Sequence, residues 1–480
     1  MSVETSHALY DKQYPSWART RDAVTGQGAI IAGKDAYVPK PSGLDEQEFK
    51  AYISRGSWYG ATRRTIDGMS GLIFRKDPHI EIPEGFDYLE TLASNDGKSL
   101  RELADFVVEE ILSTGRVGVL VDFPAIDLSQ TRTLAQAEQE GDRPYLSTYV
   151  AESIVNWRWR TLKAYRILDR VILKETVSVP DPQDEFSLID VDQYRELGLD
   201  DAGKYYQRLW KLGDDGKTWT ADEPVYPTFR GAALMRLPFF CATPMGDFID
   251  CPIVPLLDLV NLNIAHWKNS CDYEHGLHFT GNPMPVITGY SATEGETITV
   301  GSERCLTLTD PQAQAFYMEF TGTGLSSLKE AMKDKEARMA MVGSRLLTED
   351  TKGVEAAETA AIHRAGENSV LGSIAAATSK VLTRAYALMI DWAGGNPDDV
   401  TIQLNMDFLP WSMDAQMVTA LVAAQQTGLF SKQTLFQKFQ EGEVIPQGID
   451  YETDQERIEE EMMLALPMVV DTGQIDANQQ

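Results

Sequence analysis

The stretch between residues 256 and 392 constrains the fold of this chain more than any other part. Leu256–His275 has helical character, Pro283–Phe320 alternates like short strands, and Leu325–Leu346 is amphipathic again. Val354–Trp392 then runs for about 39 residues without a proline, which as a helix would be roughly 58 Å long. Helices average about 11–12 residues, so this order predicts a subunit that finds packing partners in a ring or a filament.

The predicted long helix has one apolar face and a firm end. Its apolar positions follow one another in steps of three and four, which keeps them on one side of a helix. Gly394, Gly395 and Pro397 then end it. The expected buried face consists of Val370, Ile374, Ala377, Val381, Ala385, Leu388 and Trp392.

The charge balance is strongly acidic. The chain has 480 residues, a net charge of -29 and a pI of about 4.6. A protein that grips DNA through its phosphates uses Lys and Arg, so this balance argues against a sequence-specific DNA-binding protein. It is compatible with a protein that lets DNA slide past. General solubility explains the same acidity equally well, so composition leaves both interpretations open.

Cysteine usage and hydropathy bear on the compartment. Cys241, Cys251, Cys271 and Cys305 form no CxxC pair, which is typical of free thiols in a reducing cytosol. Met1–Arg21 lacks the apolar core of a signal peptide. No apolar run approaches the roughly 20 residues of a membrane-spanning helix, so we expect no membrane segment.

The first 250 residues are patterned as an α+β domain. Met1–Gly43 looks irregular because of its prolines, and Asp45–Ile73 reads as one helix with a weak point at Gly56. Leu100–Thr114 is predicted to be a second helix. Ser99 starts it in a capping box with the glutamate three residues further on.

Strands are predicted after this helix. Val117–Phe123 has the apolar composition of a buried strand, and Tyr145–Phe240 is patterned as a series of strands. The clearest of these are Tyr165–Val179 and Tyr205–Leu212. The turn Gly213–Gly216 predicts a hairpin to the next short strand.

The C-terminal part is predicted to be mostly helical. Val400–Trp411 is expected to return as a strand to the first domain, and Met413–Gln426 is a helix. Ser431 caps a helix over Lys432–Gln440. Thr453 is expected to cap a further, acidic helix.

The sequence carries no strong catalytic motif. Gly97-Lys98-Ser99 resembles the end of a phosphate-binding loop, but position 92, where the motif needs a glycine, is Leu92. No other stretch assigns an acid, a base or a nucleophile. We therefore expect neither enzymatic activity nor a cofactor.

One group of side chains is a weak candidate for a metal site. Cys271, His275 and His278 have the spacing i, i+4, i+7, and zinc accepts such ligands. The helix is expected to end near Gly276, which would turn His278 away, and a fourth ligand is not evident. Packing of the thiol and the imidazoles at a helix end is the alternative.

Four stretches occur in a characteristic order: GLIFRKDP (Gly71–Pro78), VGVLVDFP (Val117–Pro124), NLNIAHWKNSCDYEHGLHFTG (Asn261–Gly281) and Pro283–Thr288. Together they resemble the portal proteins of tailed bacteriophages, specifically a group once known only as an uncharacterised domain. The resemblance extends from about Trp17 to Leu346. Its later elements agree in order rather than in motif, and no single motif is chemically specific.

The resemblance implies a portal fold with an α/β wing, a two-helix stem, a small β-containing clip, a long spine helix and a helical C-terminal crown. Its expected boundaries are 1–251 for the wing, 252–275 and 325–343 for the stem helices, 276–324 for the clip, 344–353 for the tunnel loop, 354–411 for the spine helix and wing closure, and 412–480 for the crown and polar tail.

The implied function is a ring, typically of twelve copies, at one capsid vertex of the virion, assembled in the host cytoplasm. The ring is a conduit for packaging and ejection of double-stranded DNA without sequence specificity. Implied partners are the terminase large subunit, major capsid or scaffold proteins, and head-completion or tail adaptor proteins. No membrane is involved, and the separate terminase supplies the work of packaging.

Two sets of site residues follow from the resemblance. The tunnel loop would project toward DNA with Arg345, Thr348, Glu349, Asp350, Thr351, Lys352 and Gly353. The clip would dock partners with Asn282, Pro283, Thr293, Glu294, Glu296, Glu303 and Arg304. Pairing of the charged loop residues across subunits is the alternative to contact with DNA.

Three other interpretations remain open. The chain could be a metal-dependent enzyme that uses the Cys/His cluster, another ring or adaptor protein of a virion, or a non-viral helical scaffold. Adaptor proteins are usually much shorter, and a scaffold would not need the strand-forming excursion between two helices.

Overall fold

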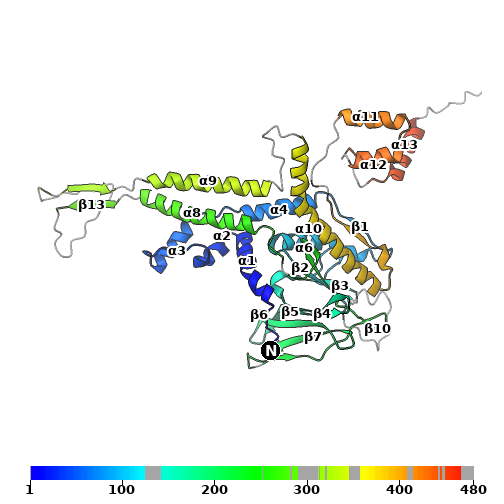
Figure 1. Ribbon diagram of the computed structural model, residues 1–480, viewed down its shortest axis with the longest axis horizontal. Helices are drawn as coiled ribbons and strands as arrows, with labels where there is room; N and C mark the ends of the chain where they lie inside the picture. Colours follow the sequence, from blue (N-terminus) through cyan, green and yellow to red (C-terminus); the bar gives the residue numbers. More distant parts are fainter. Residues whose placement is uncertain are drawn as a thin grey trace, which may run out of the picture. The chain divides into compact units, whose positions relative to one another are not determined.

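The computed structural model combines helices with antiparallel strands, so the fold is α+β (Figure 1). It describes residues 2–124, 141, 143–213, 215–250, 252–281, 284–289, 312, 314–318, 322–344, 357–406, 408, 415–441, 444–445 and 449–465. Contacts divide the chain into two units, Met1–Met406 and Asp407–Gln480. None of the helices in these ranges is long and apolar enough to cross a membrane.

The prediction that Met1–Gly43 is irregular is wrong. Two helices, α1 (Ala8–Thr25) and α2 (Gln27–Ala32), form there and are followed by a short 3-10 turn. Pro15 lies inside α1 and removes one backbone hydrogen bond. The fully buried Trp17 holds the helix in place, and its indole N–H donates to the carbonyl oxygen of Thr114 at 2.8 Å. Packing of Trp17 therefore stabilises the helix although Pro15 disfavours it.

The helix predicted over Asp45–Ile73 is two helices, α3 (Glu46–Arg55) and α4 (Ala61–Ile73). The break begins at Gly56, where an added Cβ would lie 2.6 Å from the Sγ atom of Cys271. A glycine is needed at this point because another helix approaches the backbone too closely for a side chain.

The helix predicted over Leu100–Thr114 is confirmed. α6 (Leu100–Thr114) begins at the predicted capping box, in which the Glu102 amide donates to Ser99 Oγ at 3.3 Å and the Ser99 amide donates to Glu102 Oε2 at 2.9 Å. It ends at Gly115, whose φ of 85° is left-handed and favours glycine. A short helix, α5 (Tyr88–Thr91), precedes it.

Two antiparallel sheets form the body of the first unit and pack through a shared core. The strand orders are β12-β11-β2-β3 and β4-β5-β6-β7-β8. Leu120 of the first sheet and Trp157 of the second are buried in the same cluster. The strands are β2 (Val117–Asp122), β3 (Tyr145–Val150), β4 (Ile154–Leu162), β5 (Tyr165–Asp181), β6 (Asp184–Leu199), β7 (Tyr205–Leu212), β8 (Trp219–Ala221), β11 (Phe239–Thr243) and β12 (Gly246–Asp247).

These strands confirm the predictions made for them. β2, β5 and β7 lie where strands were predicted, and β7 pairs with β8 across the turn at Gly213. The second sheet is a meander, because every neighbouring pair of strands is also consecutive in the chain. Two further short pairs are β1 (His79–Glu81) with β15 (Thr401–Gln403), and β9 (Thr228–Phe229) with β10 (Ala232–Ala233). β15 is thus the strand that returns to the first domain, although it is shorter than predicted.

The long helix is confirmed as α10 (Ala357–Trp392), which has 36 residues and packs on β11, β12 and α6. Its predicted face is buried from Ile374 to Leu388, whereas Val370 is exposed. The helix ends as predicted, with the amide of Gly395 donating to the carbonyl oxygen of Ile390 at 2.8 Å.

The second unit contains α11 (Ala415–Gln426), α12 (Lys432–Glu441) and α13 (Tyr451–Ala465). Ser431 caps α12 as predicted, because its Oγ accepts from the Thr434 amide at 3.1 Å. Thr453 is not the cap of α13. The helix begins two residues earlier, and the Thr453 amide donates to Asp450 Oδ1 at 2.8 Å.

Candidate functional site

The candidate site is an antiparallel pair of helices, α8 (Leu257–Gly281) and α9 (Thr323–Ser344), that run side by side in Figure 1. Between them in the chain lie β13 (Met284–Thr288) and β14 (Gln314–Met318), which pair with each other along their full lengths. The predicted order of helix, strand-forming excursion and return helix is therefore confirmed.

Both helices differ from the predicted boundaries. α8 does not end near Gly276 but continues to Gly281. The glycine lies against α9, where an added Cβ would be 2.5 Å from Leu325 Cδ2, so it permits close helix packing instead of ending the helix. α9 begins at Thr323, two residues before the predicted start at Leu325.

Polar and apolar contacts hold the pair together. The Nε2 atom of His266 on α8 lies 3.0 Å from Oε1 of Glu336 on α9. The His266 side chain is buried, and its Nδ1 has no hydrogen-bond partner within the described residues. Leu259 and Met339 share a buried cluster with Ala61 of α4, so both helices also pack against the first unit's N-terminal helices.

Polar residues of α8 form hydrogen bonds with α3, with α4 and with the segment between them. Asn263 is fully buried, and its Oδ1 accepts from both the amide and the hydroxyl of Thr62 at 3.2 and 3.0 Å, while its Nδ2 donates to the Tyr59 carbonyl oxygen at 2.7 Å. Further along, the Tyr52 hydroxyl donates to Asp272 Oδ1 at 2.6 Å. Burial and this hydrogen bond raise the pKa of Tyr52.

The surroundings of Cys271 and the two histidines favour packing over metal binding. Cys271 is buried beneath Gly56, and burial raises the pKa of its thiol to about 12, so it is protonated at neutral pH. His275 stacks edge-on against Tyr52 and faces the guanidinium of Arg55 at 3.4 Å. Burial first, then Arg55, lowers the pKa of His275. No group of three or more His, Cys, Asp or Glu in the described ranges is arranged to hold a metal.

The residues predicted for the tunnel loop and for docking lie outside the described residues, so these assignments stay predictions. This applies to Arg345, Thr348, Glu349, Asp350, Thr351, Lys352 and Gly353 of the loop. It applies equally to Asn282, Pro283, Thr293, Glu294, Glu296, Glu303 and Arg304 of the clip.

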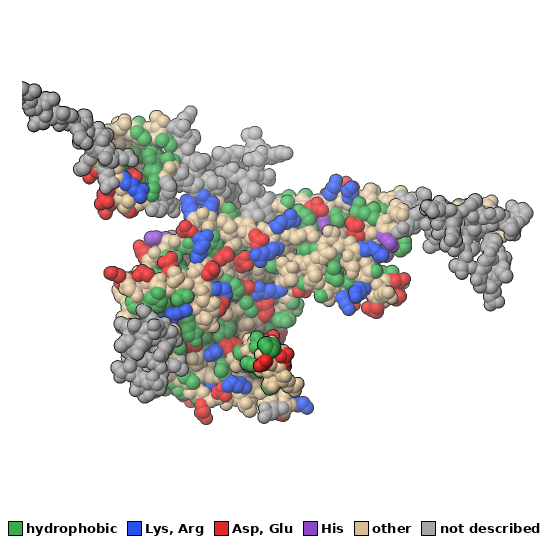
Figure 2. Space-filling view, turned by 180° about the vertical axis from the view of Figure 1, so that it is seen from behind, with side chains coloured by type: hydrophobic (Ala, Val, Ile, Leu, Met, Phe, Trp, Pro, Cys, Tyr) green, Lys and Arg blue, Asp and Glu red, His purple; other side chains and the backbone are tan. Residues whose placement is uncertain are grey.

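The link between His266 and Glu336 was not predicted from the sequence. The two residues are 70 positions apart on different helices, and no local motif joins them. Only the predicted antiparallel arrangement of two helices could have suggested that some polar pair connects them. The face seen in Figure 2 shows acidic and basic side chains interspersed along this helix pair, without a continuous basic stripe.

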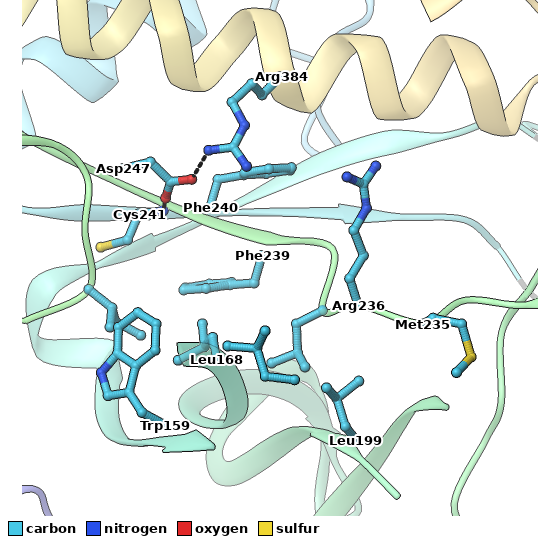
Figure 3. A pocket seen from close by; sticks show the side chains of 13 residues that line it. Trp159, Leu168, Leu199, Met235, Arg236, Phe239, Phe240, Cys241, Asp247 and Arg384 are labelled. Carbon is cyan, nitrogen blue, oxygen red and sulfur yellow. Dashed lines mark hydrogen bonds and ion pairs between the residues drawn. The ribbon is translucent and has the colours of Figure 1, made fainter. Parts of the chain in front are cut away.

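A cavity of about 320 Å³ lies at one end of the two packed sheets (Figure 3). Trp159, Leu168 and Phe239 line its apolar part. Arg384 of α10 is ion-paired with Asp247 at its upper side in Figure 3. The cavity has an apolar lining with arginines beside it. It can therefore accept an apolar group that has a negatively charged group next to it.

Comparisons with known proteins bear on the same part of the chain. The sequence model of a domain of unknown function, DUF4055, matches residues 255–393, which contain α8, β13, β14, α9 and α10. No curated protein matches the sequence.

Solved structures from gene transfer agent (GTA) particles resemble the fold. One is the virion of a native GTA particle, with a TM-score of 0.38 and 12% identity over 84% of this chain and 96% of that chain. Another is the neck of an empty GTA particle with C6 symmetry, with a TM-score of 0.38 and 12% identity over 86% of this chain and 97% of that chain.

Proposed function

We propose that this chain is the subunit of a portal ring at one capsid vertex of a phage-like virion. The observation that carries the proposal is the antiparallel α8–α9 pair with the β13–β14 strand pair between its two helices. Repeated around an axis, such a pair forms the wall of a tube, and the excursion forms a protruding foot. The four ordered stretches found in the sequence support the same assignment.

In this proposal the ring conducts double-stranded DNA during packaging and ejection. A net charge of -29 on each copy limits tight binding to phosphates, so DNA can move without stalling. The clip residues would dock the terminase and, later, head-completion or tail adaptor proteins. The chain itself would not be an enzyme, because the terminase would supply the work.

The tunnel loop gives a direct test of the conduit. Deletion of Thr348–Lys352 should leave the ring intact but reduce the amount of DNA packaged or retained in particles, because the loop would contact DNA in transit. Packaged DNA per particle is measured by nuclease protection. A matched control removes the last five residues of the chain. If the loop deletion packages and retains DNA as well as this control, the conduit assignment is wrong.

A further inference from the structure

The distal parts of β5 and β6 form a two-stranded ribbon, Thr176–Asp192, beyond the rest of their sheet. β4 pairs with β5 only as far as Leu173, and β7 pairs with β6 only from Gln193 onward. In the described part of the chain, the ribbon strands pair only with each other. An isolated two-stranded ribbon is at best marginally stable in water, so a packing partner is expected.

The two faces of the ribbon differ in chemistry. On one face, the Thr176 and Ser178 hydroxyls donate to the carboxylates of Asp192 and Asp190 at 2.8 and 2.6 Å. The other face is apolar and between 37% and 43% exposed. It consists of the cross-strand pairs Val177 with Val191 and Val179 with Ile189. An apolar face of this kind on an extended ribbon indicates an interface.

The tip of the ribbon is both apolar and acidic. Phe186 is 90% exposed and Leu188 is 65% exposed. Four carboxylates and no Lys or Arg occur between Thr176 and Val191. The complementary surface must therefore combine an apolar hollow with positive charge.

The opposite end of the same sheet has this combination. β5 begins at the β4–β5 turn and ends at the ribbon tip, so the two features lie at opposite ends of one strand. Residues 158–170 around that turn include five basic residues and only one acidic residue, Asp169, which is buried between Arg158 and Arg160. Lys204 offsets part of the charge of Asp200 and Asp201 in the neighbouring turn, so this end stays net positive.

The cavity of Figure 3 lies at this basic end. Trp159 and Leu168 of the β4–β5 hairpin line it together with Met235 and Arg236. The Arg166 guanidinium lies 5.3 Å from the centre of the Trp159 ring, which places a further positive charge beside the hollow. An aromatic side chain flanked by carboxylates fits such a site.

We propose that the ribbon docks on the basic end of the β4–β8 sheet in a second copy of this chain. Phe186 would enter the cavity, and the acidic tip would face Arg166 and Arg236. Each copy has one ribbon and one receiving end, so the contact is head-to-tail and can repeat until a ring closes. This inference rests on the ring in the proposed function and supplies its subunit contact.

Charge reversal on each side tests the contact. The ribbon variant carries Asp184→Arg and Glu185→Arg, and the receptor variant carries Arg166→Glu and Arg236→Glu. Each variant alone should self-associate about tenfold more weakly or worse, because like charges then face each other. An equimolar mixture should recover association, since every contact in an alternating assembly again joins opposite charges. Sedimentation velocity and mass photometry over a concentration series measure both effects.

Two controls separate the contact from general effects. Glu84→Arg with Asp87→Arg makes the same change of charge on exposed residues away from the sheet, and should assemble like the unaltered protein. Phe186→Ser should weaken association by about tenfold through loss of the apolar anchor. Circular dichroism establishes that every variant is folded.

The outcomes distinguish this contact from the portal assignment. Recovery in the mixture, with weak association of each variant alone, establishes the contact, even if rings then fail to package DNA and the portal assignment falls. Variants that assemble like the unaltered protein would overturn the contact and leave the portal assignment standing. A folded mixture that stays dissociated, or an unaltered protein that stays monomeric at every concentration, would also overturn the contact.

Discussion

His266 on α8 and Glu336 on α9 are joined by a 3.0 Å hydrogen bond at a point where the imidazole is almost completely buried. The bond connects the two halves of the proposed channel wall, while Leu259 and Met339 pack nearby. A buried imidazole that loses its partner carries an uncompensated desolvation cost. Removing one partner should therefore cost more stability than the small net contribution of a typical hydrogen bond.

Replacing the carboxylate tests this link. Glu336→Ala should lower the free energy of unfolding by about 1–3 kcal/mol, because His266 would then be buried without its acceptor. Denaturant titration followed by circular dichroism measures the change. Glu330→Ala on the exposed side of α9 is the matched control and should have little effect. Equal stability of the two variants would show that the bond contributes nothing.

Close packing at Gly276 should change the usual effect of a glycine-to-alanine substitution on helix stability. Glycine to alanine inside a helix normally stabilises by up to about 1 kcal/mol. Gly276→Ala should stabilise less than this, because its Cβ would lie 2.5 Å from Leu325 Cδ2 and the end of that side chain must move. Leu325→Ala in the same chain should restore part of the missing stabilisation, which a double-mutant cycle detects. Gly281→Ala, with open space around it, is the control.

Arg116 provides a third test, because its fully buried guanidinium lies between two indoles. Its centre is 4.8 Å from the Trp17 ring and 4.9 Å from the Trp157 ring, and it donates to the carbonyl oxygens of Ile249, Ala151 and Ile154. Arg116→Ala should cost more than about 3 kcal/mol, because these carbonyls lose their donor and a cavity remains. Thermal unfolding monitored by tryptophan fluorescence measures the loss. A variant as stable as the parent would contradict this role.

The thiol of Cys271 predicts a dependence on pH. Burial raises its pKa to about 12 from an ordinary value of 9.0. Above pH 9.0 the unfolded chain releases this proton while the folded chain keeps it, so stability should fall as pH rises toward 12. Cys271→Ala should weaken this fall. Iodoacetamide should label Cys271 only after unfolding, as peptide mass analysis would show, and rapid labelling of the folded chain would contradict the burial.

Local signals predicted the elements whose ends are determined by nearby residues. The capping box at Ser99 placed the start of α6, and the glycines after Trp392 placed the end of α10. A continuous apolar run located β2, and strand-type patterning located β5 and β7. In each case the physical cause lies within a few residues of the element.

The errors arise where distant parts of the chain decide the structure. Pro15 suggested an irregular segment, but burial of Trp17 against α6 stabilises α1. Gly276 suggested a helix end, but it is the contact point for Leu325 of α9. The partnership of His266 with Glu336 likewise depends on how two helices align. For the candidate site, the helix pair could be predicted from sequence and the side-chain pairs that join it could not.

The most direct test of the portal assignment is electron microscopy of the purified protein, viewed along the particle axis. The account predicts closed rings with an open central channel, and a reconstruction in which α8 and α9 of every copy border that channel. Rings that place α8 and α9 on the outer circumference, or a folded monomer that binds metal stoichiometrically at Cys271 and His275, would contradict it.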